Sequence, residues 1–392
     1  PGHLDLKADA AAKNLLDANR MEASARFEGD FRDLAFLKAL LPDTALRRRV
    51  AIPALIRLRG SAGADRGTFS TASTLSADGG ELSVKGRFNP REQSYDAAIR
   101  ADSFPLNSFL PADSLGIVDL TLQARGTGFD PLLPRTRTSL RAQIDRAEFG
   151  GRDFGGIELD AELDSQRLSG RISDRDEALR LLLSVSGTLT EREQRIGLSG
   201  SVFGFDLAAL GVSPEPIGGS FALDASASAA GKGAYAARIA LDSIEIRNKH
   251  RTDRIRPTSV SLHTDSAATR AEAASGDLSL TFSTPQSADS LIAALTRSAR
   301  ALAGQIDAQS IDMEQLKPAL PDFALRVSAG PDNILNSLLK SRKIAFDALN
   351  AEGANCDSLP VSIRLRTEGL AYGNVVLDTV TADIRQNGKR LE

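Results

Sequence analysis

The side chains that could do chemistry are few in this chain and lie far apart. The three histidines, His3, His250 and His263, have no cysteine or carboxylate at the spacing that metal ligands require. The acidic run from Asp174 to Glu177 lacks the alternating oxygen ligands and the glycine of a calcium loop, so we interpret it as a hairpin tip. We therefore expect no metal site and no cofactor.

Nucleophile and phosphate motifs are also incomplete. The serines within 168–170 and 197–200 are not in nucleophile elbows, because the second glycine is misplaced. The glycine pairs at 126–128 and 231–233 precede expected strands and lack the rest of a phosphate-binding fingerprint. The single cysteine, Cys356, lies in a polar loop without a nearby histidine and can form no intrachain disulfide. These patterns predict that the chain is not an enzyme.

Composition narrows the remaining classes of function. The 392 residues carry 48 basic and 51 acidic side chains, and the longest basic run, Arg47–Arg49, fits a solvated turn. A nucleic-acid interface needs a basic face, so we expect no nucleic-acid partner. No apolar run approaches the about 18 residues of a membrane helix. No signal peptide opens the chain, and we expect a piece of a longer protein whose membrane anchor lies outside this segment.

The most regular stretch of the sequence is 116–126, where apolar and polar residues alternate. Val118, Leu120 and Leu122 fall on one side, whereas Thr121 and Gln123 fall on the other. This period of two predicts a half-buried strand.

A short Leu-rich turn segment precedes that strand at 104–111, and similar segments occur at 33–42, 205–214 and 311–321. Each is followed by a strand that we expect to stop at a glycine, as at Gly60 and Gly126. The polar residues expected to cap a one-turn helix in these segments are Asp33, Asp206, Asp312 and, at 104–111, Ser103 or Asp102.

The whole chain contains about eighteen to twenty alternating stretches and no strand–helix–strand pattern, which favours an antiparallel meander. We predict a mostly β fold, an elongated antiparallel sheet curved into a trough, with a few short amphipathic helices. The trough is expected over 1–285 and continues over 286–392 with helical insertions at 288–302 and 332–341. These helices could plug, cap or widen the trough, or cover a sheet edge. The first has its apolar face at Leu291, Ile292, Leu295, Ala299 and Leu302.

Uncharged apolar residues recur on one side of strand after strand. A slide for acyl chains needs such rows, and a closed structural core needs them equally, so both interpretations remain open. The residues that we expect to line a lipid groove are Val118, Leu120, Leu122, Leu140, Ile144, Ile157, Leu159, Leu163, Leu181, Leu183, Val185, Ile196, Leu198, Leu278, Leu280 and Phe282.

The turn and strand residues at 104–115, 118–128 and 149–163 resemble the TamB proteins of the Bacteroidota, within the AsmA-like superfamily. The resemblance is clearest over 1–230. It implies a periplasmic β-sheet trough, anchored in the inner membrane of a Gram-negative bacterium, whose apolar interior guides phospholipid between the two membranes. It also implies an outer-membrane barrel partner of the Omp85 type.

Two hypotheses of different class follow from these observations. The first is a bridge-like lipid conduit, and the second is a structural or chaperone-like scaffold for the translocation and assembly of outer-membrane proteins. In a lipid conduit the apolar rows would face a groove that solvent can enter, whereas in a structural scaffold they would be sealed in a core.

Overall fold

The computed structural model confirms a mostly β, antiparallel fold. Two compact units, Pro1–Glu191 and Arg192–Glu392, divide the chain and are described separately. The residues that the structure describes are 4–14, 20–32, 50–111, 115–231, 233–249, 251–307, 312–341, 343–356, 359–388 and 390–391. The predicted turn segment at 33–42 and the basic run Arg47–Arg49 lie outside them.

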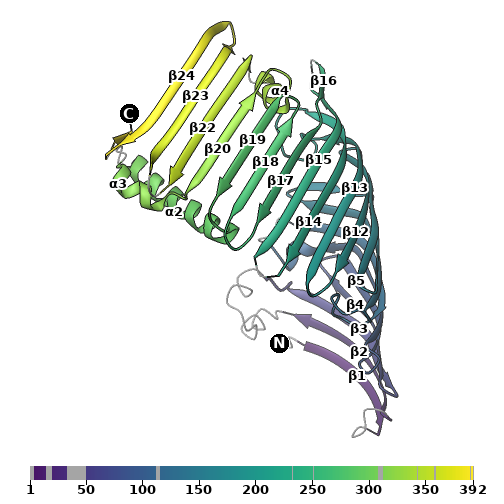
Figure 1. The fold of residues 1–392 in the computed structure, drawn as a ribbon. Helices are drawn as coiled ribbons and strands as arrows, with labels where there is room; N and C mark the ends of the chain where they lie inside the picture. The colour runs from purple at the N-terminus through teal and green to yellow at the C-terminus, as the bar shows by residue number, and fades with distance from the viewer. Residues whose placement is uncertain are drawn as a thin grey trace. The chain divides into compact units, whose positions relative to one another are not determined.

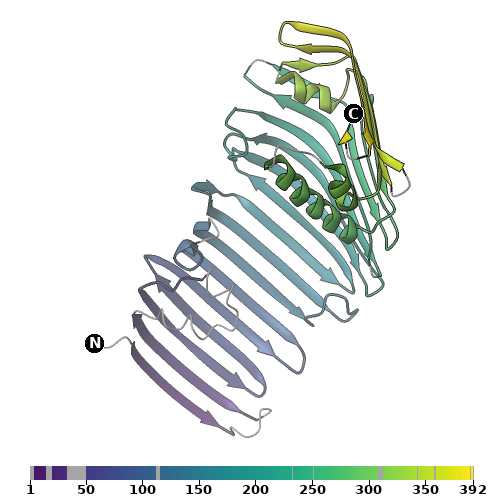
Figure 2. The ribbon, with the colours of Figure 1, turned by 90° about the vertical axis from the view of Figure 1, so that its left-hand side faces the viewer.

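The first unit is one antiparallel sheet in which almost every strand pairs with its neighbours in sequence. The exception is β8, which pairs with the short β9 and with β10. Figure 2 shows these strands side by side as a curved sheet. The strands are β1 (Leu4–Lys13), β2 (Glu22–Arg32), β3 (Leu55–Asp65), β4 (Thr68–Ala77), β5 (Gly80–Asn89), β6 (Ser94–Pro105), β7 (Leu115–Thr127), β8 (Arg137–Phe149), β9 (Arg152–Phe154), β10 (Ile157–Asp164), β11 (Arg167–Arg175) and β12 (Leu179–Leu189).

The second unit continues the meander with longer insertions, as Figure 1 shows. Its strands are β13 (Glu193–Asp206), β14 (Gly218–Ala230), β15 (Ala234–Arg247), β16 (Thr252–Ile255), β17 (Thr258–Thr264), β18 (Thr269–Ser275), β19 (Leu278–Thr284), β20 (Phe323–Ala329), β21 (Ile344–Ala345), β22 (Ala348–Cys356), β23 (Leu359–Tyr372), β24 (Val375–Asn387) and β25 (Arg390–Leu391). All of their described pairings are antiparallel.

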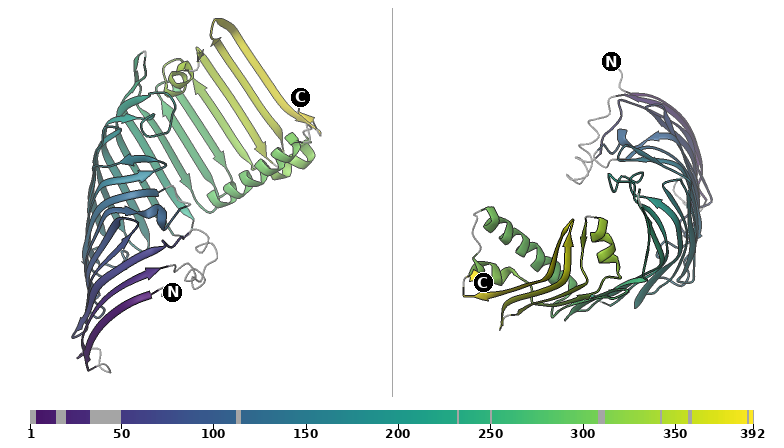
Figure 3. Two further views of the ribbon diagram at one scale, coloured as in Figure 1. Left: turned by 180° about the vertical axis from the view of Figure 1, so that it is seen from behind. Right: turned by 90° about the horizontal axis from the view of Figure 1, so that it is seen from above.

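Both predicted helical insertions are present in the second unit. The first is α2 (Ala288–Asp307), followed by α3 (Met313–Leu316) and the 3-10 turn η3 (Lys317–Ala319); the second is α4 (Ile334–Ser341). Figure 3 shows α2 and α4 on the same side of this unit's strands, near opposite strand ends. The helices therefore occupy the ends of the strands and leave their middles uncovered.

The expectation that glycine ends the strands was wrong at Gly60 and Gly126, which lie inside β3 and β7. A Cβ on Gly60 would meet the Ser73 hydroxyl and the Ala72 carbonyl of β4, at 2.6 and 2.8 Å, and the Phe27 ring of β2 at 2.9 Å; one on Gly126 would meet the Arg137 carbonyl of β8 and, at 2.8 Å, the Tyr95 hydroxyl. Glycine fits at these positions because the neighbouring strands approach too closely for a side chain.

The predicted cap is present in one turn segment and absent from another. The Asp206 carboxylate accepts hydrogen bonds from the amides of Ala208 and Ala209, at 2.8 and 3.1 Å, and holds a tight turn after β13. At 104–111 the single turn η2 (Leu106–Ser108) forms, but Pro105 precedes it and no side chain caps it. There the expected Ser103 or Asp102 cap was wrong, because Pro105 takes the capping position.

Candidate functional site

The apolar residues of the first unit align in rows that cross the sheet from strand to strand. Leu122 of β7 lies opposite Ile99 and Ala142, and Leu120 lies opposite Ala101 and Ile144. Since alternate residues of a strand share a face, one face collects the apolar set. The complete row through Leu122, from β1 to β12, is Ala8, Phe27, Gly60, Ser73, Val84, Ile99, Leu122, Ala142, Leu159, Ile172 and Leu183.

All eleven groove candidates of the first unit lie on this face. Val118 and Leu183 are buried, at 4% and 7% exposure, and the other nine are half-buried. A sealed core would exclude solvent from nearly all of them, and this face does not. The rows therefore form a lining that is partly accessible to solvent.

One end of the row face is covered, by the residues that follow β6. Phe104 stacks on Phe109 with ring centroids 5.2 Å apart, and both pack with Val118 and Leu120. This explains why Val118 is buried. In the described part of the first unit, the other contacts between elements join strands of the same sheet, so no second layer covers the middle of the face.

The second unit repeats the arrangement with a more exposed face. Leu198 begins a row that crosses Ile239, Val260 and Leu280, and Ile196 begins a parallel row through Phe282. Ile196, Ile239 and Val260 are 45%, 46% and 46% exposed. Leu198, Leu278, Leu280 and Phe282 are half-buried, so all five candidates of this unit share one open face.

Several residues of these rows were absent from the expected set, although alternation in their own strands would have found them. They are Phe27, Leu58, Leu75, Leu82, Ile99, Ile172, Ile239, Val260, Leu325 and Ile363.

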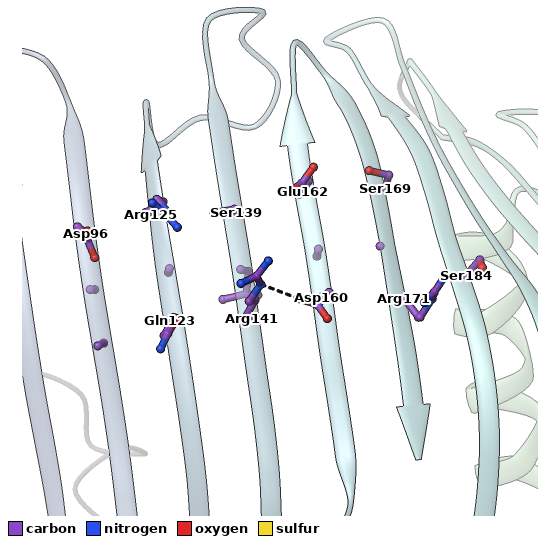
Figure 4. Close-up of a pocket in the computed structure, with 16 residues that line it drawn as sticks. Asp96, Gln123, Arg125, Ser139, Arg141, Asp160, Glu162, Ser169, Arg171 and Ser184 are labelled. Carbon is purple, nitrogen blue, oxygen red and sulfur yellow. Dashed lines mark hydrogen bonds and ion pairs between the residues drawn. The ribbon is translucent and has the colours of Figure 1, made fainter. Parts of the chain in front are cut away.

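The opposite face of each sheet is charged. In the first unit Arg141 pairs with Asp160 at 3.0 Å across β8 and β10, beside an open hollow of about 920 Å³ (Figure 4). The side chains of such pairs are at least 37% exposed, so each contributes little stability, although together they keep this face hydrated. Other cross-strand pairs on these faces are Asp30–Arg57, Glu28–Arg59, Arg137–Asp164, Glu245–Arg254, Arg326–Glu352 and Arg364–Asp383.

One carboxylate interrupts the apolar face. Asp174 occupies the row position between Ile157 and Leu181 and is 7% exposed. Its Oδ1 accepts a hydrogen bond from the Asp176 amide at 2.9 Å. Burial among apolar neighbours raises the pKa of Asp174 despite that bond.

Among the described residues no three His, Cys, Asp or Glu side chains are grouped as metal ligands would be. Asp174 and Asp176 form a hairpin turn, as the sequence predicted. No helix in the described part of the chain is long and apolar enough to cross a membrane.

Comparison with known proteins gives no further identification. No family model, curated protein or solved structure matches the chain. The resemblance to the TamB family thus stays a prediction, and the site is argued from its own geometry.

Proposed function

We propose that the apolar face of each unit holds the acyl chains of phospholipids and guides them along the sheet. The observation that carries this proposal is the accessible apolar lining, because a soluble protein rarely leaves a large contiguous apolar surface without an occupant. A lipid chain is a suitable occupant, since it needs apolar contact and no hydrogen-bond partners.

The composition of the rows favours a mobile occupant over a fixed one. Small residues such as Gly60, Ala124 and Gly170 separate the leucines and isoleucines, and a continuous row crosses all the main strands of the first unit. At about 4.8 Å between strands, a row over eleven strands is about 50 Å long, which exceeds one lipid tail. Such a row offers many nearly equivalent positions along which a chain can move.

The charged opposite face supports the same proposal. Cross-strand pairs such as Arg141–Asp160 keep that face in water, so the two faces of the sheet have opposite solvation. A lipid conduit of the bacterial envelope would need this asymmetry. We accordingly propose a periplasmic location, an anchor to the inner membrane outside this segment, and an Omp85-type barrel partner, as the resemblance implies.

A photo-crosslinking residue placed on each face tests the proposal directly. With the crosslinker at Leu122 or Leu159, illumination of the protein in Gram-negative cells should give phospholipid adducts detected by mass spectrometry. The matched control places the crosslinker at Gln123, the exposed neighbour on the charged face. The proposal would be overturned if crosslinkers at Leu122 and Leu159 gave adducts to protein and none to lipid. It would also be overturned if the crosslinker at Gln123 gave as many lipid adducts as those at Leu122 and Leu159.

The scaffold function has one observation in its favour. In the described residues, β24 pairs with β23 along one edge and with β25 at Gln386 and Asn387. Val375 and Val376 near its start are 58% and 65% exposed. Exposed apolar side chains of this kind can contact apolar segments of an unfolded protein. Crosslinks from Val376 to unfolded outer-membrane proteins, without lipid at Leu122, would favour the scaffold.

A further inference from the structure

An aromatic wall stands at one strand end of the first unit's apolar face. Tyr95 of β6 lies across Gly126 of β7, because a Cβ on that glycine would be 2.8 Å from the Tyr95 hydroxyl, which is 2.7 Å from the Thr138 hydroxyl of β8. The Phe129 ring stacks on Tyr95 with centroids 5.4 Å apart, and its centroid is 5.6 Å from that of Phe88 in β5. Phe129 is 60% exposed, so the wall rises above the face.

The loop between β7 and β8 holds Phe129 in place. On one side of the ring, the Gly128 amide donates a hydrogen bond to the Gln93 carbonyl at 2.9 Å. On the other side, the hydroxyl of Thr136 donates to the Asp130 carbonyl at 2.5 Å, and Thr136 is only 2% exposed. Because these bonds fix the loop on both sides of Phe129, the fold itself sets the position of the aromatic wall.

A second wall stands at the opposite ends of the same strands. The stacked rings of Phe104 and Phe109 pack with Val118 and Leu120, near the start of β7. The Ala51 amide donates a hydrogen bond to the Phe109 carbonyl at 2.6 Å, so the segment before β3 also holds this wall. The two walls therefore face each other along the strands, with the middle of the apolar face between them.

Between the two walls, the described residues leave a floor that is two side chains wide on each strand. On β7 the floor residues are Leu122 and Ala124, since the preceding apolar residue, Leu120, packs with one wall and the following one, Gly126, lies under the other. The matching residues of β6 and β5 are Ile99, Ala97, Val84 and Gly86. At about 3.3 Å per residue, this floor is about 13 Å wide along the strands.

We propose that the two walls form a constriction that admits the chains of one two-chain phospholipid at a time and excludes lipids with four or more chains. Acyl chains in van der Waals contact lie about 4–5 Å apart, so two of them fit side by side on this floor. A second pair would have to leave the floor or displace rings that hydrogen-bonded loops hold in place. The inference rests on the proposed function, because it assigns a width to the same conduit.

Phosphatidylglycerol and cardiolipin test the width, because their head groups share the same chemistry and they carry two and four chains. A diazirine side chain of leucine size at Leu122 reports lipid between the walls. The same group at Ile172 of β11, three strands from β7 in the pairing order, reports lipid beyond them. After illumination with vesicles of both lipids, the ratio of phosphatidylglycerol to cardiolipin adducts should be about tenfold higher at Leu122, since extra chains overpack the constriction. Equal ratios at the two positions would overturn the proposal.

Removal of an aromatic ring should widen the constriction. In Phe129→Ala, which takes away the exposed ring of the wall, the adduct ratio at Leu122 should fall to the ratio at Ile172. Phe203→Ala is the matched control, because that ring is 58% exposed and belongs to β13 of the second unit. A ratio that stays high in Phe129→Ala, or that falls equally in Phe203→Ala, would contradict the assignment of Phe129 to the wall.

A larger floor residue should close the constriction. The floor row of Gly86, Ala97 and Ala124 contains only small residues. A Cβ on Gly86 would have no neighbour closer than 3.7 Å, so Gly86→Leu fits the fold and places a side chain on the floor. This variant should reduce the yield of all lipid adducts at Leu122 and leave the yield at Ile172 and the melting temperature unchanged. An unchanged yield at Leu122 would show that the chains do not lie on this floor, and the proposal would fail.

The same measurements distinguish failure of the constriction from failure of the conduit. Lipid adducts at Leu122 and Ile172 with equal ratios would remove the constriction and keep the conduit. The absence of lipid adducts at both positions would overturn the proposed function, and the constriction with it.

Discussion

At the scale of single residues, one cross-strand row contains both an accessible and a buried leucine. Leu159 and Leu183 flank Ile172 in the row, but only Leu183 is buried, at 7% exposure. Leu159→Asp should lower the free energy of unfolding by about 1 kcal/mol because its carboxylate stays partly hydrated, whereas Leu183→Asp should cost about 3–5 kcal/mol. Urea denaturation measures both.

The same pair of variants connects stability to the proposed function. Leu159→Asp should reduce lipid binding although the protein remains folded, because the charge lies where acyl chains must pass. Gln123→Asp, on the charged face, should change neither quantity. If Leu159→Asp unfolds as readily as Leu183→Asp, the row is a sealed core and the accessible-groove interpretation fails.

Asp174 predicts a pH dependence of stability with a definite sign. Burial raises the pKa of its carboxyl in the folded protein, so the folded state holds this proton more tightly than the unfolded state. Its contribution to stability should therefore fall as the pH rises above the unfolded value of about 3.9, until the folded pKa is passed. Asp174→Asn keeps the acceptor oxygen and should remove that fall, so the gain in unfolding free energy should be larger at pH 7 than at pH 4. An equal gain at both pH values would contradict this assignment.

At the scale of elements, α4 is fixed by two asparagines that are almost completely buried. Asn336 donates hydrogen bonds to the carbonyls of Phe346 and Pro331, at 2.8 and 3.1 Å, and its Oδ1 accepts one from the Phe346 amide at 3.3 Å. Asn333 donates to the Asp277 carboxylate at 2.6 Å and accepts from the Asn336 amide, which caps the helix. These bonds join α4 to the β18–β19 turn and to the chain after β21.

Asn336→Ala should therefore destabilise the second unit by about 2–4 kcal/mol, since it leaves buried backbone groups of Phe346 without partners. Leu338→Ala on the same helix is the control, because that side chain is 54% exposed and should cost less than about 1 kcal/mol. Chemical denaturation gives both values, and hydrogen exchange should show faster exchange at 344–347 only in Asn336→Ala. Equal destabilisation by the two variants would show that α4 is held by apolar packing instead.

The sequence predicted strands where the alternation of apolar and polar residues is strong. It missed a strand where the residue composition favours a helix. β7 alternates cleanly and forms as expected, and its leucines share a face as predicted. β18, with the sequence Thr-Arg-Ala-Glu-Ala-Ala-Ser, was missed because alanine and glutamate favour helices and only pairing with β17 and β19 makes it a strand.

The sequence alone also could not predict which side of α2 is packed or how exposed the apolar rows of the sheet are. Alternation identifies which residues share a face, but the cover over that face depends on distant segments. Thus Ala294 and Ser298 pack because α3 and η3 meet them, and Val118 is buried because Phe109 folds back over it.

At the scale of the whole molecule, each unit combines an accessible apolar face with a charged face. The two units have the same design, although their helices and loops differ. Exposed ion pairs keep one face in water, and the other face lacks a covering layer in the described residues. We therefore expect the occupant of the apolar face, and not an internal core, to control the solution behaviour of the protein.

Protein purified without detergent from a Gram-negative host should consequently carry phospholipid or fatty acid in native mass spectra. Removal of the lipid should expose the apolar faces and produce concentration-dependent self-association, because apolar surface then finds its only available partner in another copy. Returning phospholipid should restore the monomer, and addition of a soluble sugar of similar mass should not. A stable, ligand-free monomer that takes up no labelled phospholipid would show that the faces need no occupant, and it would remove the physical basis of the conduit.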